Sequence, residues 1–166
     1  MSSDKYALLE SELNTLVGAP CWAVLVSGGL DNRVTLSFGD QLPRSTPLLA
    51  DTLTKAQQQF AGAYELSIAD CTWRLDSPDE IVTSWSDDTA ARRHWLGYLV
   101  GQRITAWEIT WPGLDLTLHA ANSLTLRLFC DQTNPDDSSD NYTLHTPQRV
   151  FLVGVRSHLD VQPRHL

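Results

Sequence analysis

The spacing of hydrophobic residues along the chain predicts three helices. Near the N-terminus, Leu9, Leu13 and Leu16 recur at three- and four-residue steps and therefore share one helical face. Gly18 suits the left-handed position at the end of this helix. Thr46–Pro47 supplies a cap and a favourable first residue for a second helix. The predicted helices cover residues 5–17, 47–60 and 89–100.

Elsewhere, apolar and polar residues alternate over short segments, as they do in strands that bury one face. Leu124, Leu126 and Leu128 are an example, and residues 121–123 before them have the composition of a hairpin turn. The predicted strands cover residues 21–26, 33–38, 64–68, 73–75, 80–85, 103–111, 114–118, 124–128, 142–144 and 150–155. This succession predicts an α+β fold with a mostly antiparallel sheet and two or three helices.

One six-residue pattern, Leu-x-x-Leu-Val-Gly, occurs at residues 13–18 and again 83 residues later, at 96–101. Each copy ends a predicted helix, and a Gly-Leu-Asp turn follows each, at residues 29–31 and 113–115. The repetition predicts two related halves, each a helix with an antiparallel meander, with a pseudo-twofold axis between them. The predicted division is a first half, 1–87, with 47–60 as an inserted helix, a second half, 88–156, and a flexible tail, 157–166. Halves this small are expected to pack as one module around a shared core.

The acidic composition limits the classes of partner. The 166 residues include 20 Asp and Glu but only 12 Lys and Arg, which gives a formal net charge of -8. Binding to duplex nucleic acid needs a basic face, so this class is not expected. An acidic surface favours a basic protein partner, although the same charge also serves solubility alone.

The cysteines and the N-terminus point to the cytoplasm. Cys21, Cys71 and Cys130 are odd in number and include no Cys-x-x-Cys pair, so we expect reduced thiols. The first residues are polar, and no segment has the length of a signal core or a membrane-spanning helix.

No motif of a catalytic, cofactor or metal site is present. The sequence lacks a phosphate-binding glycine loop, a Gly-x-Ser-x-Gly turn and the His-x-x-x-His spacing of a metal site. We therefore expect no enzymatic activity, no cofactor and no metal. If the protein is an enzyme, its site is assembled from scattered residues between the halves, with Asp115, His119 and Cys130 as candidates.

Two surface features are candidates for binding a partner. The loop 131–140 is rich in aspartate, and its negative charges imitate nucleic-acid phosphates before a basic protein. The candidate acids are Asp131, Asp136, Asp137 and Asp140. Trp107 and Trp111 fall on one face of the strand 103–111, and exposed tryptophans are common in protein interfaces.

Several apolar strand patterns give the sequence a family resemblance. In the first half they are Gly62-Ala63-Tyr64-x-Leu66-x-Ile68, Trp73-Arg74-Leu75 and Asp79-x-Ile81-Val82. In the second half they are Leu99-Val100-Gly101-x-x-Ile104, Asp115-Leu116-x-Leu118 and Leu124-x-Leu126-x-Leu128-Phe129. With these segments the chain resembles small bacterial proteins that are similar to immunity proteins of polymorphic toxin systems. The resemblance implies a small, acidic, cytoplasmic protein that sequesters a toxin domain.

Together these observations favour a protein-binding module, and most specifically an immunity-type inhibitor of a toxin or another basic protein. Two alternatives stay open. The first is a structural or regulatory subunit of a larger bacterial assembly, which would associate through the strand with Trp107 and Trp111. The second is the enzyme with a site between the halves.

Overall fold

The computed structural model describes residues 2–28, 32–134 and 140–166, and these residues form an α+β structure. Its helices are α1 (Ser2–Leu16), α2 (Lys55–Gln59) and α3 (Thr89–Leu96), with single 3-10 turns at Gly97–Leu99 and Val155–Ser157. The described strands pair only in antiparallel fashion. The fold class predicted from the hydrophobic spacing is confirmed.

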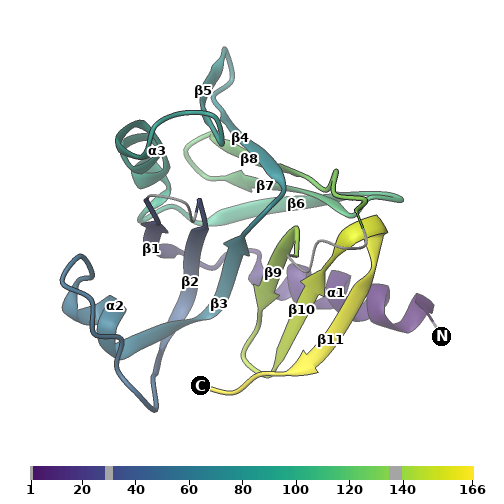
Figure 1. Ribbon diagram of the computed structural model, residues 1–166, viewed down its shortest axis with the longest axis horizontal. Coiled ribbons are helices and arrows are strands. Elements are labelled where there is room, and N and C mark those ends of the chain that lie inside the picture. The colour runs from purple at the N-terminus through teal and green to yellow at the C-terminus, as the bar shows by residue number, and fades with distance from the viewer. Residues whose placement is uncertain (1, 29–31, 135–139) are drawn as a thin grey trace.

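The strands form two sheets, seen in Figure 1 one above the other, with α1 behind the lower one. The lower sheet has six strands in the order β1-β2-β3-β9-β10-β11. These strands are β1 (Cys21–Val26), β2 (Val34–Pro43), β3 (Phe60–Ile68), β9 (Tyr142–His145), β10 (Arg149–Val153) and β11 (Leu159–Pro163). The upper sheet has the order β5-β4-β8-β7-β6. Its strands are β4 (Thr72–Asp76), β5 (Ile81–Ser84), β6 (Ile104–Thr110), β7 (Asp115–Ala120) and β8 (Thr125–Phe129).

One continuous hydrophobic core joins both sheets with α1 and α3. Leu9, Leu13 and Leu16 of α1 are buried in it, which confirms the helical face predicted from their spacing. Tyr142 of β9 is also fully buried, and its hydroxyl donates to the carbonyl of Leu114 at 2.9 Å. This hydrogen bond links a strand of the six-stranded sheet to the residue before β7 in the other sheet.

Each half of the chain contributes strands to both sheets. β1, β2 and β3 lie in the six-stranded sheet, whereas β4 and β5 cross to the five-stranded sheet. In the second half, β6, β7 and β8 lie in the five-stranded sheet, whereas β9 and β10 cross to the six-stranded sheet. If β1 to β5 are matched in order with β6 to β10, matched strands also have matched partners. β3 pairs with β9, and their counterparts β8 and β4 pair with each other. The halves are therefore interleaved, and a common origin for them stays a prediction.

The two copies of the repeated pattern end side by side, where residues 18–21 meet residues 101–104. Four main-chain hydrogen bonds form this junction: Gly18 N–H to Ile104 O (2.7 Å), Gly101 N–H to Cys21 O (2.7 Å), Cys21 N–H to Gln102 O (2.8 Å) and Ile104 N–H to Ala19 O (3.1 Å). If 83 is added to the residue number in the first half and subtracted from the number in the second half, each bond is converted into another of the four. The junction therefore has local twofold symmetry.

The predicted helix 47–60 is wrong over most of its length, because α2 begins only at Lys55. Thr54 and Gln57 form a capping box, in which the Thr54 hydroxyl accepts from Gln57 N–H and the Gln57 side chain accepts from Thr54 N–H. This later cap starts the helix in place of Thr46. Leu49, inside the predicted helix, is 93% exposed.

The predicted flexible tail 157–166 is also wrong, since β11 pairs with β10 along its whole length. Leu159 is buried and Val161 packs against the core. Two apolar residues at alternate positions are too short a pattern to predict a strand. Arg164 follows β11 and donates to three main-chain carbonyls, those of Gly62, Ala63 and Thr146.

The junction predicts that substitution of either of its two glycines lowers the free energy of unfolding by a similar amount. Gly18 has φ +90° and Gly101 has φ +87°, and no atom lies within 4 Å of a Cβ added at either. Gly18→Ala and Gly101→Ala should therefore each lower the free energy of unfolding by about 1–2 kcal/mol, through backbone strain alone. Urea denaturation measures this.

Gly97→Ala is the matched control, because Gly97 is equally open but has helical φ -58°. It should leave stability unchanged or raise it by about 0.5 kcal/mol. Equal effects of all three substitutions would contradict a conformational origin.

Candidate functional site

β1 is an outer strand of the six-stranded sheet, and most of one edge has no neighbouring strand in the described part of the chain. β2 pairs with its other edge. On the other side Cys21 bonds to Gly101 and Gln102, and the Val26 carbonyl accepts from Arg93 of α3. Figure 1 shows β1 at the margin of the sheet, between α3 and α2. The edge is open only in the sense that no strand of the described chain pairs with residues 22–26, because α3 and the 3-10 turn after it lie against β1 and Val26 is 2% exposed.

Main-chain groups of Val24 and Val26 face this open edge. Ser27 N–H donates to the carbonyl of Arg33, toward β2. Residues of an antiparallel strand alternate between those that bond to the partner strand and those that point away, so Val24 and Val26 point away from β2. The carbonyl of Val26 accepts from Nη2 of Arg93 at 3.1 Å. Within the described residues, no other recorded bond outside the ladder uses these groups.

The segment 44–59 forms a wall next to β1. Its turn is closed by the Gln58 side chain, which donates to the carbonyls of Ala50 (3.1 Å) and Leu53 (3.2 Å). Gln58 also accepts from Leu48 N–H through its carbonyl, at 2.9 Å. The wall is thus held in shape by its own hydrogen bonds.

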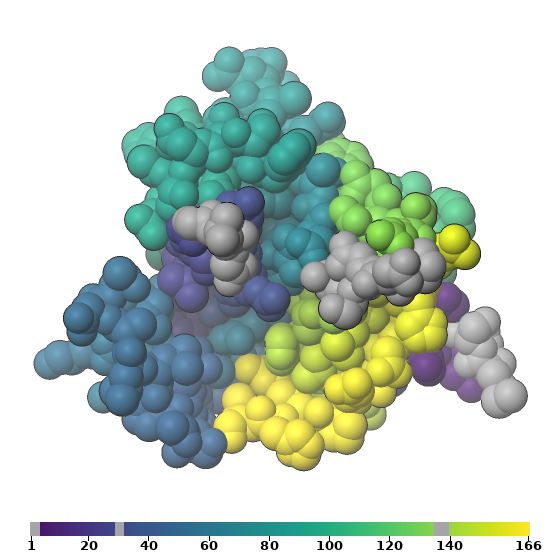
Figure 2. Space-filling view, in the orientation of Figure 1, coloured from purple at the N-terminus to yellow at the C-terminus, as the bar shows by residue number. Residues whose placement is uncertain are grey.

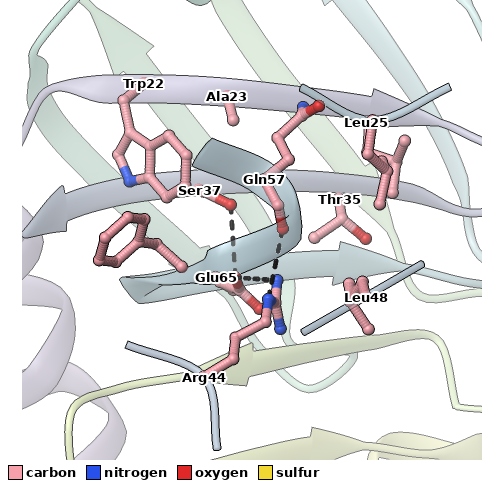
Figure 3. A pocket seen from close by; sticks show the side chains of 11 residues that line it. Trp22, Ala23, Leu25, Thr35, Ser37, Arg44, Leu48, Gln57 and Glu65 are labelled. Carbon is pink, nitrogen blue, oxygen red and sulfur yellow. Dashed lines mark hydrogen bonds and ion pairs between the residues drawn. The ribbon is translucent and has the colours of Figure 1, made fainter. Parts of the chain in front are cut away.

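Two neighbouring hollows lie between β1 and this wall. The larger has a volume of about 740 Å³ and is lined by Val24, Leu25, Val26, Ser27, Gly28, Ala50, Thr52, Leu53, Gln57 and Arg93. The smaller, of about 200 Å³, lies over the outer face of β1, β2 and β3 (Figure 3). Leu25, Leu53 and Gln57 line both. We call the two together the β1 groove; its larger part is in the size range of ligand sites.

The smaller hollow has a polar floor built around Glu65, as Figure 3 shows. Oε1 of Glu65 accepts from Gly62 N–H at 2.9 Å and from Ser37 Oγ at 3.4 Å, and Arg44 Nη2 lies 3.8 Å away. The Glu65 side chain is 13% exposed and that of Arg44 23%. Arg44 Nε also donates to the carbonyl of Gln57 within the wall, and the ion pair of Arg44 with Glu65 of β3 ties the wall to the sheet. The floor is therefore largely self-satisfied and close to neutral.

The rest of the smaller hollow is apolar, with one unpaired donor. Trp22, Leu25, Leu48, Leu53 and Phe60 supply the apolar lining. The indole N–H of Trp22 is buried and has no hydrogen-bond partner among the described residues. An apolar wall with an unused donor is able to hold a side chain or a carbonyl from another molecule.

His145 of β9 stands opposite Glu65 in the strand register, on the same face of the sheet. Burial lowers the pKa of His145, and the nearby Arg164 guanidinium lowers it further, against the opposing effect of Glu65. Nδ1 of His145 is buried without a partner in the described residues. His145 is therefore a neutral imidazole near pH 7.

The structure describes two of the four predicted partner-binding acids, Asp131 and Asp140. Asp131 is exposed and accepts from the Thr72 hydroxyl at 3.4 Å. Asp140 is half-buried, and burial raises its pKa against the opposing effect of Arg33. Asp136 and Asp137 lie outside the described residues.

The two predicted tryptophans differ in accessibility. Trp107 is half-buried under α1, and its indole N–H donates to Asn14 Oδ1 at 2.9 Å. Trp111 lies just beyond β6 and is 48% exposed, with Tyr6 of α1 edge-on to its ring at 4.6 Å. Trp111 is thus the more accessible of the two.

The residues considered for an enzyme do not form a catalytic group. Asp115 accepts from the main-chain N–H of Cys130 at 2.7 Å, which fixes the turn after β8. His119 lies four residues along β7, about 13 Å from Asp115 by strand geometry. Its ring contacts Thr125 and Glu108 instead. Burial also raises the pKa of Cys130, so its thiol is not activated.

Two further classes of site were tested on the described residues. No group of three or more His, Cys, Asp or Glu side chains in them is placed to hold a metal ion. None of their helices has both the length and the apolar character needed to cross a membrane.

The β1 groove was not predicted from the sequence. The bounds of β1, Cys21–Val26, agree with the predicted strand, but its open edge follows from strand order. The one local signal for the wall is the Thr54-x-x-Gln57 capping box.

Comparison with known proteins gave no matching family model, no curated relative and no solved structure.

The cysteine environments predict slow alkylation. Burial raises the pKa of Cys21 and of Cys71 to about 12, and that of Cys130 is raised as well. Because the thiolate is the reactive form, iodoacetamide should label the native protein far more slowly than the urea-unfolded protein. Mass spectrometry of the labelled protein over time measures this. Rapid native labelling of Cys130 would contradict the prediction and support the enzyme alternative.

His145 predicts a loss of stability on acidification. In the folded protein the pKa of His145 lies below its ordinary value of 6.5. As the pH falls through 6.5, the unfolded chain therefore binds more protons at this residue than the folded protein does. The free energy of unfolding should therefore fall as pH drops from 7 toward 5. His145→Gln should show a smaller fall in urea denaturation over the same range, while other groups titrate equally in both proteins. Parallel pH curves for the two proteins would contradict this.

Proposed function

We propose that this protein is a binding module for another protein, and that the β1 groove is the surface it uses. The observation on which the proposal rests is the hollow of about 740 Å³ between β1 and the segment 44–59. Val24 lines this hollow, and its main-chain N–H and carbonyl point away from β2, so they are a donor and an acceptor for a segment of a partner. The adjoining apolar hollow offers a place for one of its side chains.

Binding is favoured over catalysis because the polar groups of the groove are engaged with one another. Glu65 forms an ion pair with Arg44 and accepts from Gly62 N–H and from the Ser37 hydroxyl, so its carboxylate is already engaged within the protein. The thiols have raised pKa values. These features suit recognition better than proton or group transfer.

In its most specific form the proposal is an immunity-type inhibitor in the bacterial cytoplasm, with a toxin or another basic protein as its partner. The formal charge of -8 supports a basic partner, because it speeds the approach of opposite charge. The exposed carboxylate of Asp131 adds to this attraction away from the groove. Charge would then set the association rate, and the groove would set the lifetime of the complex.

Filling the groove should abolish partner binding. Ala50 is exposed and lines the larger hollow, so Ala50→Trp blocks the hollow without disturbing the core. Tagged wild-type protein should capture one dominant, basic partner from its native host, more at low salt than at high salt. With the purified partner, Ala50→Trp should weaken the Kd at least about tenfold, the loss expected for a blocked central contact.

Leu49→Trp is the control, because Leu49 is the neighbouring residue and is fully exposed outside both hollows. It should bind like wild type. Equal binding by all three proteins would assign recognition to another surface. A partner bound equally well at all salt concentrations would count against the charge argument.

A further inference from the structure

We propose that the outer face of the five-stranded sheet binds a small-molecule phosphate monoester, whose phosphate lies between Arg74 and Arg127 and whose apolar or aromatic part occupies the adjoining hollow. This site lies on a different sheet from the β1 groove and is independent of the proposed function. Three features of the face define the ligand.

The first feature is a row of hydrogen-bond donors across four strands. In the strand register, Arg127 of β8 lies between Thr117 of β7 and Arg74 of β4, and Arg74 in turn lies opposite Ser84 of β5. The residues on either side of both arginines along their strands are buried, so this row faces outward. Neighbouring strands are about 4.8 Å apart. Two like charges directly opposite each other destabilise a sheet, so the pair of arginines calls for an anion between them.

The second feature is the way in which Asp76 holds the two arginines. Nε of Arg74 donates to Oδ2 of Asp76 at 3.2 Å, and Nε of Arg127 donates to the same oxygen at 2.9 Å. Two guanidiniums thus share one carboxylate, which leaves one positive charge in excess. Within the described residues, no hydrogen bond or ion pair is recorded for the Nη groups of either arginine, and none of these groups is buried. Asp76 therefore fixes both guanidiniums and leaves their outer donors accessible.

The other carboxylates near this row already have partners. Oε2 of Glu108 lies 3.7 Å from Nε2 of His119, and Asp115 accepts from a main-chain N–H just after β8. Asp131 accepts from the Thr72 hydroxyl. The anion that completes the row must therefore come from outside the described chain. A phosphate monoester suits it, because guanidiniums bind phosphate through parallel hydrogen bonds and the ester carries close to two negative charges.

The third feature is a hollow of about 250 Å³ whose lining includes Arg74, Ile81, Trp85 and Phe129. The side chains of Ile81 and Trp85 are more than half exposed. The guanidinium of Arg74 lies over the ring of Phe129, 5.5 Å from its centre, so the charged row and the apolar hollow are in direct contact. A phosphate bonded directly to one ring would place that ring against Trp85 and Phe129.

The test is a titration of the isotope-labelled protein with phenyl phosphate, followed by nuclear magnetic resonance. The Nε–H signals of Arg74 and Arg127 and the indole N–H signal of Trp85 should shift and saturate together. The indole signal of Trp111, which lies beyond β6 at the opposite edge of the sheet, should not move. The titration also gives the Kd.

Arg74→Gln and Arg127→Gln should each weaken the Kd about tenfold, because each removes charge-assisted hydrogen bonds to the phosphate. Lys55→Gln is the control, because it removes the same charge from an exposed side chain of α2, beside the other sheet. It should leave the Kd unchanged. Unshifted main-chain amide signals of β6 and β7 in the free variants would show that each variant is folded.

The apolar part of the ligand has its own test. Methyl phosphate should bind about tenfold more weakly than phenyl phosphate, because it leaves the hollow empty. Trp85→Ala should remove most of this difference and leave the binding of methyl phosphate unchanged. Benzenesulfonate, which has the same ring but a single charge, should bind more weakly than phenyl phosphate.

Four results would overturn the inference. They are the absence of a saturable shift with phenyl phosphate, an equal loss in Lys55→Gln, a loss in only one of the two arginine variants, and equal binding of benzenesulfonate. An equal loss in Lys55→Gln would assign binding to overall charge, and equal binding of benzenesulfonate would assign it to any anion. None of these results bears on the β1 groove, whose test uses Ala50→Trp and a protein partner.

Discussion

The junction between residues 18–21 and 101–104 is the constraint on which the remaining architecture depends. It fixes where α1 ends, where the 3-10 turn after α3 ends, and where β1 and β6 begin, because all four meet there. Both chain reversals need a left-handed residue, and a glycine supplies it in each. The same contacts occupy Cys21, so they also set the point at which the edge of β1 becomes open.

The groove arises because the two halves are alike in topology but unequal in what surrounds their first strands. β1 and β6 both lie at sheet edges, α3 lies against β1, and α1 lies against β6. Only the first half has the long segment 44–59, and this segment turns the edge of β1 into a walled hollow. In Figure 2 it is part of the blue mass at the lower left, next to the C-terminal residues in yellow. The candidate binding surface therefore lies in the part of the fold where the two halves differ.

Short-range patterns predicted most elements, whereas the site depends on long-range order. The bounds of β1 and the helical face of α1 follow from alternation and from three- to four-residue spacing, which are local. The helix 47–60 failed because the capping box at Thr54 outweighs an equally plausible cap at Thr46. The pairing of β3 with β9, and thus which edge stays open, joins residues far apart in the chain. No local pattern contains that information.

The exchange of strands between the sheets has a consequence for how such a molecule assembles. Neither half contains all the strands of either sheet. The first half ends with β4 and β5, and β4 pairs with β8 of the second half; the second half ends with β9 and β10, and β9 pairs with β3 of the first half. A half-length chain could close its hydrogen bonds only by trading that hairpin with an identical chain, which is a domain-swapped twofold dimer. The single chain has the strand exchange of such a dimer, but one polypeptide connects the two halves. Their association is therefore intramolecular, and the connection between the halves, instead of the protein concentration, governs it.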